Sequence, residues 1–144
     1  MISRNELEHR HSVLREVMDD AGYSALVVAG NAEYMQRGYI RYLSDWRLWH
    51  GSGYFVLPLN GDPMLMLGSG SHAHWAESIG WTNKQYSDGD KLSQVISVLE
   101  AKGLSKSSIG VVGMNRIMSY QDAKLLGDSL SGARLEDATQ LMDE

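Results

Sequence analysis

Apolar residues recur at helical spacing near the start of the chain and predict an amphipathic helix there. The helix would begin after Ser3, because Ser3 followed by Glu6 is typical of a capping box, in which the serine oxygen accepts a hydrogen bond from a free backbone N–H. It would end before Gly22, since glycine is the residue that most often follows a helix. The apolar stripe between these ends consists of Leu7, Leu14, Val17, Met18 and Ala21.

Further helices and strands alternate along the rest of the chain. Helical spacing predicts a helix over residues 90–102 and another that Ser119 and Asp122 cap, with Ala123, Leu126 and Leu130 on its apolar face. The last residues, "TQLMDE", begin a further helix, and "AEYMQRG" predicts a short one. The run "SALVVAG" predicts a strand that is buried on both faces, and "SSIGVVG" and "ARLEDA" predict two more strands.

The middle of the chain predicts a hairpin. In "YFVLPLNGDPMLMLG", two apolar runs flank Asn60, Gly61 and Asp62, which tolerate turn dihedrals. Pro58 and Pro63 indicate edge positions or strand ends, because proline cannot donate to a strand ladder. We also expect a strand at "YIRYLSD" and a weak edge strand at "NKQYS".

This order of elements predicts an α/β fold with a mixed β-sheet and helices on both faces. The 144 residues fit a single domain over residues 1–144, and the sequence contains no repeat and no internal linker. The abrupt end within "DATQLMDE" leads us to expect that this domain is part of a longer chain.

Composition narrows the function classes. The formal net charge of -5 argues against a nucleic-acid surface, and the sequence has no run of basic residues that would suggest a membrane patch. The longest apolar runs are too short to span a bilayer. The sequence contains no cysteine, which excludes disulfides and thiolate metal sites. Its polar start is not typical of a signal peptide, so we expect a cytoplasmic location.

The stretch "GSGSHA" at residues 68–73 matches one form of the dinucleotide-binding fingerprint, with Asp88 near the expected acidic position. The preceding strand is, however, already paired in the predicted hairpin, whereas the fingerprint needs a strand that leads into a parallel crossover. We therefore favour a plain strand-to-helix turn that Ser69 or Ser71 caps.

Two histidine pairs raise the question of a metal site. His9 and His11, like His72 and His74, are two residues apart in predicted helical contexts, where they would point about 200° apart. We therefore expect solvated or helix-start histidines rather than ligands. The chain also lacks a nucleophile elbow, an H-E-x-x-H motif and a Walker loop, so we assign it no catalytic and no metal-binding residue.

The most distinctive stretch is "DWRLWHGSGY" at residues 45–54. It connects two predicted strands, and recognition residues are commonly placed on loops of a rigid scaffold. Tryptophan and arginine are enriched at binding hot spots. The alternative is that its tryptophans only cover the sheet edge. We expect Trp46 to pack inward, and Arg47, Trp49 and His50 to point outward as candidate substrate-binding residues.

Several short segments of the sequence resemble the N-terminal domain of creatinase, prolidase and aminopeptidase P enzymes. These are "YIRYLSD", "GYFVLPLNGDPMLML" and "DATQLM", together with an opening helix that carries Arg10 and Arg15 and leads into "AGYSALVVAGNAEYMQ". The resemblance covers essentially the whole chain and implies a ribonuclease-H-like α/β domain.

The resemblance also implies a partner domain. In this family the chemistry belongs to a larger C-terminal "pita-bread" domain, which usually supplies two aspartates, one histidine and two glutamates to a pair of divalent metals such as Mn, Co or Zn. Some members, such as creatinase, work without metal. None of those ligands can be assigned to this chain, so no cofactor is expected in it.

For residues 45–54, the resemblance implies a role between subunits. Family members are dimers or larger oligomers, and the N-terminal domain of one subunit lends side chains to the active site of another. Arg47, Trp49 and His50 would then line a neighbour's pocket for a small peptide, such as an Xaa-Pro substrate, or for a small C–N compound as in creatinase. A free-standing nucleotide-binding domain and a protein-interaction module remain open alternatives.

Overall fold

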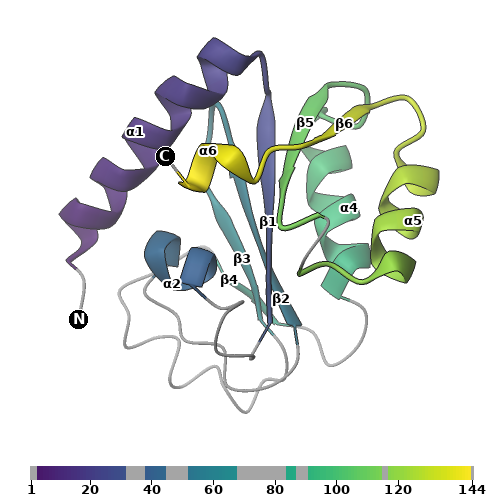
Figure 1. Cartoon of the computed structure of the whole chain (residues 1–144), viewed down its shortest axis with the longest axis horizontal. Helices are drawn as coiled ribbons and strands as arrows, with labels where there is room; N and C mark the ends of the chain where they lie inside the picture. Colours follow the sequence, from purple (N-terminus) through teal and green to yellow (C-terminus); the bar gives the residue numbers. More distant parts are fainter. Residues whose placement is uncertain are drawn as a thin grey trace.

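The computed structural model describes residues 3–31, 38–44, 52–67, 84–86, 91–114 and 117–143, and shows a six-stranded mixed sheet between two layers of helices (Figure 1). The strands are β1 (Ala25–Asn31), β2 (Ser52–Pro58), β3 (Met64–Leu67), β4 (Lys84–Tyr86), β5 (Ser108–Val112) and β6 (Arg134–Asp137). Their order across the sheet is β4-β3-β2-β1-β5-β6. β2 runs antiparallel to both neighbours, and the other adjacent pairs are parallel. The predicted mixed, ribonuclease-H-like sheet is therefore confirmed.

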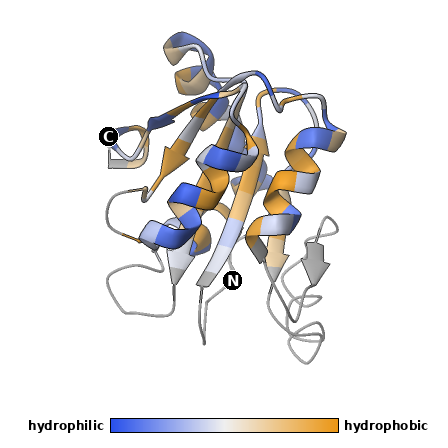
Figure 2. Ribbon diagram, turned by 90° about the vertical axis from the view of Figure 1, so that its right-hand side faces the viewer, coloured by the Kyte–Doolittle hydropathy of each residue, from blue (hydrophilic) through white to orange (hydrophobic). Residues whose placement is uncertain are grey.

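The helices cover both faces of this sheet, as the sequence predicts (Figure 1). One face carries α1 (Arg4–Ala21), α2 (Gly38–Ser44) and α6 (Gln140–Asp143). The other face carries α4 (Lys91–Ala101) and α5 (Tyr120–Ser129). Figure 2 looks at the second face, where the apolar strands lie behind helices of mixed hydropathy.

Alternation along the strands builds two apolar cores. In β1, Leu26 and Val28 face the α1 side, whereas Val27 and Ala29 face the α4 side. All four side chains are at most 1% exposed. Successive strand residues point to opposite faces, so a run without polar residues is what a doubly covered strand requires. The predicted burial of this strand on both faces is confirmed.

The predicted helix caps are present. The Ser3 hydroxyl accepts a hydrogen bond from the backbone N–H of Glu6 at 3.1 Å, and the Ser119 hydroxyl accepts one from Asp122 at 3.1 Å. Gly22 follows α1 with φ of 83°, a left-handed conformation that glycine adopts without a steric penalty.

The predicted hairpin is also confirmed, and α1 holds its turn. β2 pairs antiparallel with β3, Pro58 ends β2, and Pro63 directly precedes β3. The Arg15 side chain donates from Nε to the Pro58 carbonyl at 3.0 Å and from Nη2 to the Gly61 carbonyl. β4 is the expected short edge strand.

The strand predicted at "YIRYLSD" is wrong, because this segment forms α2. Tyrosine and isoleucine favour strands, but the buried residues Ile40, Leu43 and Ser44 follow helical spacing. Tyr42, which a strand would place on the same face as Ile40, is 49% exposed. Packing against α1 and β1 therefore overrides the local preference.

Two other expectations lie outside the described residues. These are the short helix at "AEYMQRG", apart from Gly38, and the strand-to-helix turn at residues 68–73. Within the part of the chain that the structure describes, no helix is long and apolar enough to cross a bilayer.

Candidate functional site

One end of the sheet collects the segments that carry the candidate motifs. β2 begins at this end, and the other strands finish there: β1, β3, β4, β5 and β6. The antiparallel pairing of Asn31 with Ser52 and of Tyr54 with Met66 sets β2 opposite to β1 and β3. Residues 45–51 therefore rejoin the sheet beside the point where β1 ends. Residues 68–83 leave it after β3. In an open α/β sheet, ligands bind outside the carboxyl ends of the strands.

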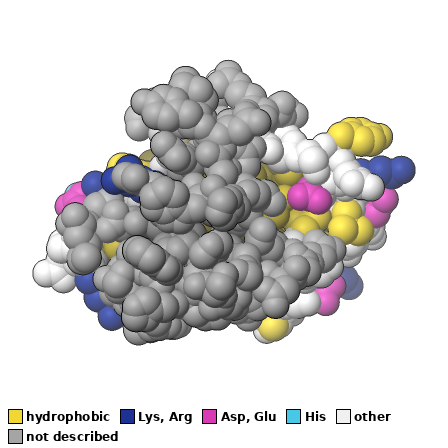
Figure 3. All heavy atoms as spheres, turned by 90° about the horizontal axis from the view of Figure 1, so that it is seen from below, with side chains coloured by type: hydrophobic (Ala, Val, Ile, Leu, Met, Phe, Trp, Pro, Cys, Tyr) yellow, Lys and Arg dark blue, Asp and Glu magenta, His cyan; other side chains and the backbone are white. Residues whose placement is uncertain are grey.

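Figure 3 looks at this end of the molecule. Among the described side chains visible there, hydrophobic, basic and acidic types are mixed, and no one type dominates. Arg47, Trp49 and His50, as well as Trp46, lie outside the described residues. Their assignment as substrate-binding residues therefore stays a prediction, and so does the inward packing of Trp46.

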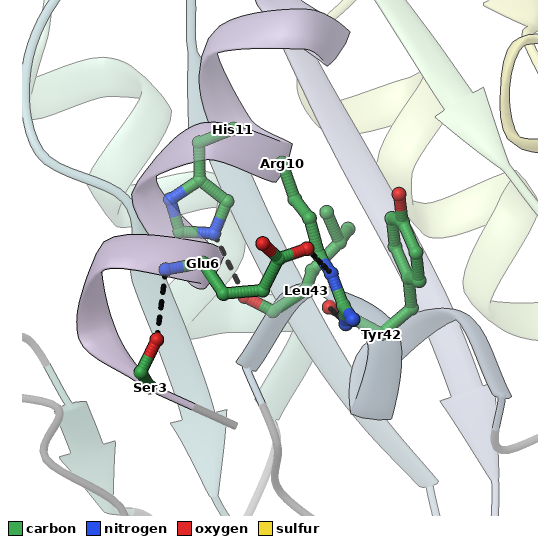
Figure 4. A network of polar contacts seen from close by, with 6 residues as sticks. All are labelled: Ser3, Glu6, Arg10, His11, Tyr42 and Leu43. Atoms are coloured by element: carbon green, nitrogen blue, oxygen red, sulfur yellow. Dashed lines mark hydrogen bonds and ion pairs between the residues drawn. The ribbon is translucent and has the colours of Figure 1, made fainter.

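The C-terminal end of α2, which directly precedes residues 45–51, is held by α1 (Figure 4). Arg10 donates from Nη1 to the Tyr42 carbonyl at 2.8 Å. Its Nε lies 3.0 Å from Glu6 Oε1, and its guanidinium carbon lies 4.3 Å from the centroid of the Tyr42 ring. The last carbonyls of a helix lack intrahelical partners, and a cation near them also favours the helix dipole.

His11 makes a second contact to the same helix end. Its Nε2 lies 2.7 Å from the Leu43 carbonyl oxygen. A carbonyl can only accept, so Nε2 carries the proton and donates. The imidazole is also near the Phe55 ring, with centroids 5.6 Å apart. Burial lowers the pKa of His11, and the hydrogen bond to Leu43 opposes this shift only in part.

The expectation that the histidines of α1 are solvated or at a helix start is wrong for His11. His9 is exposed, but His11 is only 5% exposed. His11 lies four residues after Leu7 and three before Leu14, so it occupies the buried stripe of α1. That spacing was the signal in the sequence that marks it as a core histidine.

A polar contact also joins the sheet to α5 near this end. Tyr54 is only 2% exposed, and its hydroxyl donates to Asp122 Oδ2 at 2.6 Å. It ties the start of β2 to the first turn of α5. Asp122 was expected only as a capping residue, so this contact is one that the sequence did not predict.

The turn after β5 is held by Thr139, which follows β6. Thr139 Oγ1 accepts a hydrogen bond from the Gly113 N–H at 2.9 Å and donates to Asp137 Oδ1 at 2.6 Å. Gly113 has φ of 85°, which explains the glycine at this turn. These contacts fix the strand ends as a rigid frame for the connections.

The "GSGSHA" stretch lies outside the described residues, but the strands around it are placed. The hairpin pairing of β3 with β2 is confirmed. On its other edge, however, β3 pairs parallel with β4, so residues 68–83 form a parallel crossover. The objection that the preceding strand cannot lead into such a crossover is therefore wrong.

Within the described ranges, no group of three or more His, Cys, Asp or Glu side chains is arranged to hold a metal ion.

Comparisons with known proteins agree with this fold. The sequence model for the creatinase/prolidase N-terminal domain matches residues 10–144. No curated protein matched the chain in the sequence search. Among solved structures, the N-terminal domain of cytoplasmic peptidase PepQ from Mycobacterium tuberculosis H37Rv is similar, with a TM-score of 0.74 and 14% identity over 94% of this chain and 96% of that one.

Two more similar structures differ in length. The N-terminal domain of Xaa-Pro dipeptidase from Lactobacillus brevis has a TM-score of 0.73 and 11% identity over 93% of this chain and 98% of that one. Dipeptidase PepE from Mycobacterium ulcerans has a TM-score of 0.69 and 20% identity over 99% of this chain. The match spans only 37% of the PepE chain.

Proposed function

Because the chain belongs to the creatinase/prolidase N-terminal domain family, we propose that it is the non-catalytic N-terminal domain of a hydrolase of the Xaa-Pro peptidase type. The family match over residues 10–144 is the observation that carries this proposal. Similar solved domains come from peptidases named as Xaa-Pro dipeptidase and PepQ. In this proposal the domain supports assembly and substrate recognition, and a separate domain performs the hydrolysis.

The proposal places the catalytic residues and any divalent metal, such as Mn, Co or Zn, in a C-terminal domain that follows residue 144 in the full protein. This chain matches little more than a third of the PepE chain, which supports a separate catalytic domain. The described residues of this chain offer no fitting ligand cluster, so no step of the reaction is assigned to them. We further propose that the protein is a homodimer in the cytoplasm.

Residues 45–51 would be the part of this domain that reaches a neighbouring subunit's pocket. The pairing of Ser52 with Asn31 supports this, because residues 45–51 lead directly into Ser52, at the end of the sheet where β1 finishes. Arg47 could pair with a substrate carboxylate, and Trp49 could cover an apolar ring such as that of proline. His50 would add a hydrogen-bonding group to the same pocket. A few placed polar groups in an otherwise apolar cleft are what substrate selection requires.

The experiment is a kinetic comparison in the full-length protein. Each of the substitutions Arg47→Ala, Trp49→Ala and His50→Ala is expected to lower kcat/KM for Xaa-Pro dipeptides at least about tenfold, as for a lost substrate contact. Metal content should stay unchanged. Arg4→Ala is the matched control, because Arg4 is exposed and pairs with Glu8 in its own helix. Wild-type kinetics in all three variants would refute the shared-pocket role.

Three alternatives have distinct tests. Activity on a small C–N compound but not on peptides would identify a creatinase-like parent enzyme. A nucleotide site gains support from the parallel crossover between β3 and β4. It predicts that a dinucleotide raises the Tm of this chain, and that Gly70→Val removes the effect. A protein-interaction module would instead lose a captured partner on Trp49→Ala.

A further inference from the structure

The turn between β2 and β3 contains an asparagine that a glycine follows, Asn60 and Gly61, and both residues are exposed. Within the described ranges, neither the Asn60 side chain nor the Gly61 N–H makes a hydrogen bond. Gly61 also has no side chain that would shield its nitrogen. The carboxamide of Asn60 and the backbone nitrogen that follows it are therefore both accessible, and they are close neighbours in the chain.

We propose that Asn60 is a site of spontaneous deamidation, and that the contacts of Arg15 with the turn limit its rate. In this reaction the Gly61 backbone nitrogen attacks Cγ of Asn60. A bond forms between these two atoms, and the bond from Cγ to Nδ2 breaks. The Nδ2 group leaves as ammonia and takes the proton of the Gly61 N–H, so that a cyclic succinimide remains.

Water then opens the succinimide at one of its two carbonyl carbons. Opening at Cγ gives an aspartate at position 60. Opening at the backbone carbonyl carbon gives isoaspartate, in which the chain runs through Cβ and Cγ and is longer by one atom. Both products add a carboxylate to a turn that already contains Asp62. The reaction needs only water and the chain itself, so this inference does not depend on the proposed function.

Arg15 of α1 restrains the turn on both sides of Asn60. Its Nε donates to the Pro58 carbonyl at 3.0 Å, and its Nη2 donates to the Gly61 carbonyl. Attack requires the backbone and side chain of Asn60 to rotate until the Gly61 nitrogen reaches Cγ. A turn whose carbonyls are held must first open locally before it can rotate in this way. Loss of Arg15 should therefore speed the reaction.

The isoaspartate product is also incompatible with these contacts. Its extra backbone atom lies between the carbonyls of Pro58 and Gly61, which one guanidinium binds together. The longer chain displaces one carbonyl relative to the other, so we expect at least one of the two hydrogen bonds of Arg15 to be lost. Deamidation would thus loosen the connection between α1 and the hairpin.

Asn5 provides an internal comparison, because it too is exposed. It lies in the first turn of α1, and the next nitrogen is that of Glu6, which carries a side chain. The Glu6 N–H also donates to the Ser3 hydroxyl at 3.1 Å. Attack by this nitrogen would break the helix cap. We therefore expect Asn5 to stay largely unconverted where Asn60 reacts.

The test is incubation of the folded 144-residue chain at mildly alkaline pH, followed by peptide mass spectrometry and labelling with an isoaspartate-specific methyltransferase. Asn60 is expected to convert at least about tenfold faster than Asn5, because glycine leaves the attacking nitrogen unhindered. Arg15→Met should speed conversion of Asn60 about three- to tenfold, as for one lost hydrogen bond. Asn60→Ser, which lacks the carboxamide, should abolish the isoaspartate signal of the turn.

Arg10→Met is the matched control for a general loss of stability. Arg10 lies on the same helix and also donates to a backbone carbonyl, but that carbonyl belongs to Tyr42 and not to the turn. This variant should keep conversion of Asn60 within about twofold of wild type. If Arg15→Met does not fold, Arg15→Lys replaces it with the same expected direction, because lysine keeps the charge but not the planar pair of donors.

The proposal is overturned if Asn60 of the folded chain converts no faster than Asn5, or if loss of the Arg15 guanidinium leaves its conversion unchanged. It is also overturned if Arg10→Met speeds conversion of Asn60 as much as Arg15→Met does, because a general loss of stability would then explain both effects.

Discussion

The Nε2 of His11 donates to the Leu43 carbonyl across 2.7 Å from within the buried face of α1. This bond joins two helices that are distant in sequence, and it does so with a group that can gain a proton near neutral pH. The charged groups that act on the imidazole are Arg15, which disfavours its protonation, and Glu8, which favours it. Burial has the larger effect and lowers the pKa of His11 below its ordinary value of 6.5.

A pH dependence of stability follows from this shift. Because the folded-state pKa of His11 is lowered, its contribution is present above the unfolded-state value and is lost as the pH falls through the folded-state value. We expect the free energy of unfolding of the wild type, relative to His11→Gln, to decrease as the pH falls below about 6.5. Urea unfolding between about pH 5 and 8 measures this difference. If the free energy of unfolding changes with pH in the same way for both proteins, the prediction is wrong.

The Tyr54–Asp122 hydrogen bond predicts a second effect. Tyr54→Phe keeps the buried ring but removes the hydroxyl that donates to the carboxylate, and should destabilise the fold by about 1–2 kcal/mol. Tyr120→Phe is the matched control on α5, because Tyr120 is 83% exposed, and should change stability by less than about 0.5 kcal/mol. Urea denaturation measures both. Equal effects of the two substitutions would show that the bond to Asp122 contributes nothing.

The environment of Tyr23 predicts how the stability of the fold changes at high pH. Its hydroxyl donates to Glu136 Oε2 at 3.0 Å, and burial, followed by this hydrogen bond, raises the pKa of Tyr23 above its ordinary value of 10.0. Its contribution to stability is therefore present below about pH 10 and lost as the pH rises through the folded-state pKa. Tyr23→Phe should lack this loss, and Tyr120→Phe should retain it. Unfolding midpoints between about pH 8 and 11 decide between these outcomes.

The parts of the fold that local rules govern could be predicted from the sequence. The caps at Ser3 and Ser119 require only a side-chain oxygen near a free backbone N–H, and both are present. The burial of β1 on both faces follows from a run without polar residues. The parallel pairing of β3 with β4 could not be predicted, because β4 has only three residues and the connection carries no local signal of direction.

The candidate site depends on contacts between distant residues, and the sequence predicted less of it. α2 was predicted as a strand because Ile40 and Tyr42 alternate loosely with Arg41 and Leu43. In the structure, donors from α1 bind the carbonyls of its last turn. His11 could have been identified from its place in the apolar stripe, but its acceptor could not. Arg47, Trp49 and His50 were predicted from their residue types, their place in a connection and the family resemblance, and they lie outside the described residues.

The last prediction concerns the close approach of three elements at Gly110. A Cβ atom added at Gly110 would lie 2.7 Å from both the Ala138 Cβ and Leu26 Cδ2, closer than packed carbons allow. Gly110→Ala is therefore expected to destabilise the fold by about 1–3 kcal/mol through overpacking between β1, β5 and the end of β6. Differential scanning calorimetry or urea denaturation measures the loss.

Gly127→Ala provides the opposite result in the same chain. Gly127 lies within α5, and a Cβ atom there meets nothing within 4 Å. Alanine in a helix is favoured over glycine by about 0.5–1 kcal/mol, because glycine loses more backbone entropy on folding. We therefore expect Gly127→Ala to raise stability while Gly110→Ala lowers it. A neutral Gly110→Ala would mean that β6 moves away from β5 at little cost, and that the packing at this edge is looser than the 2.7 Å separations require.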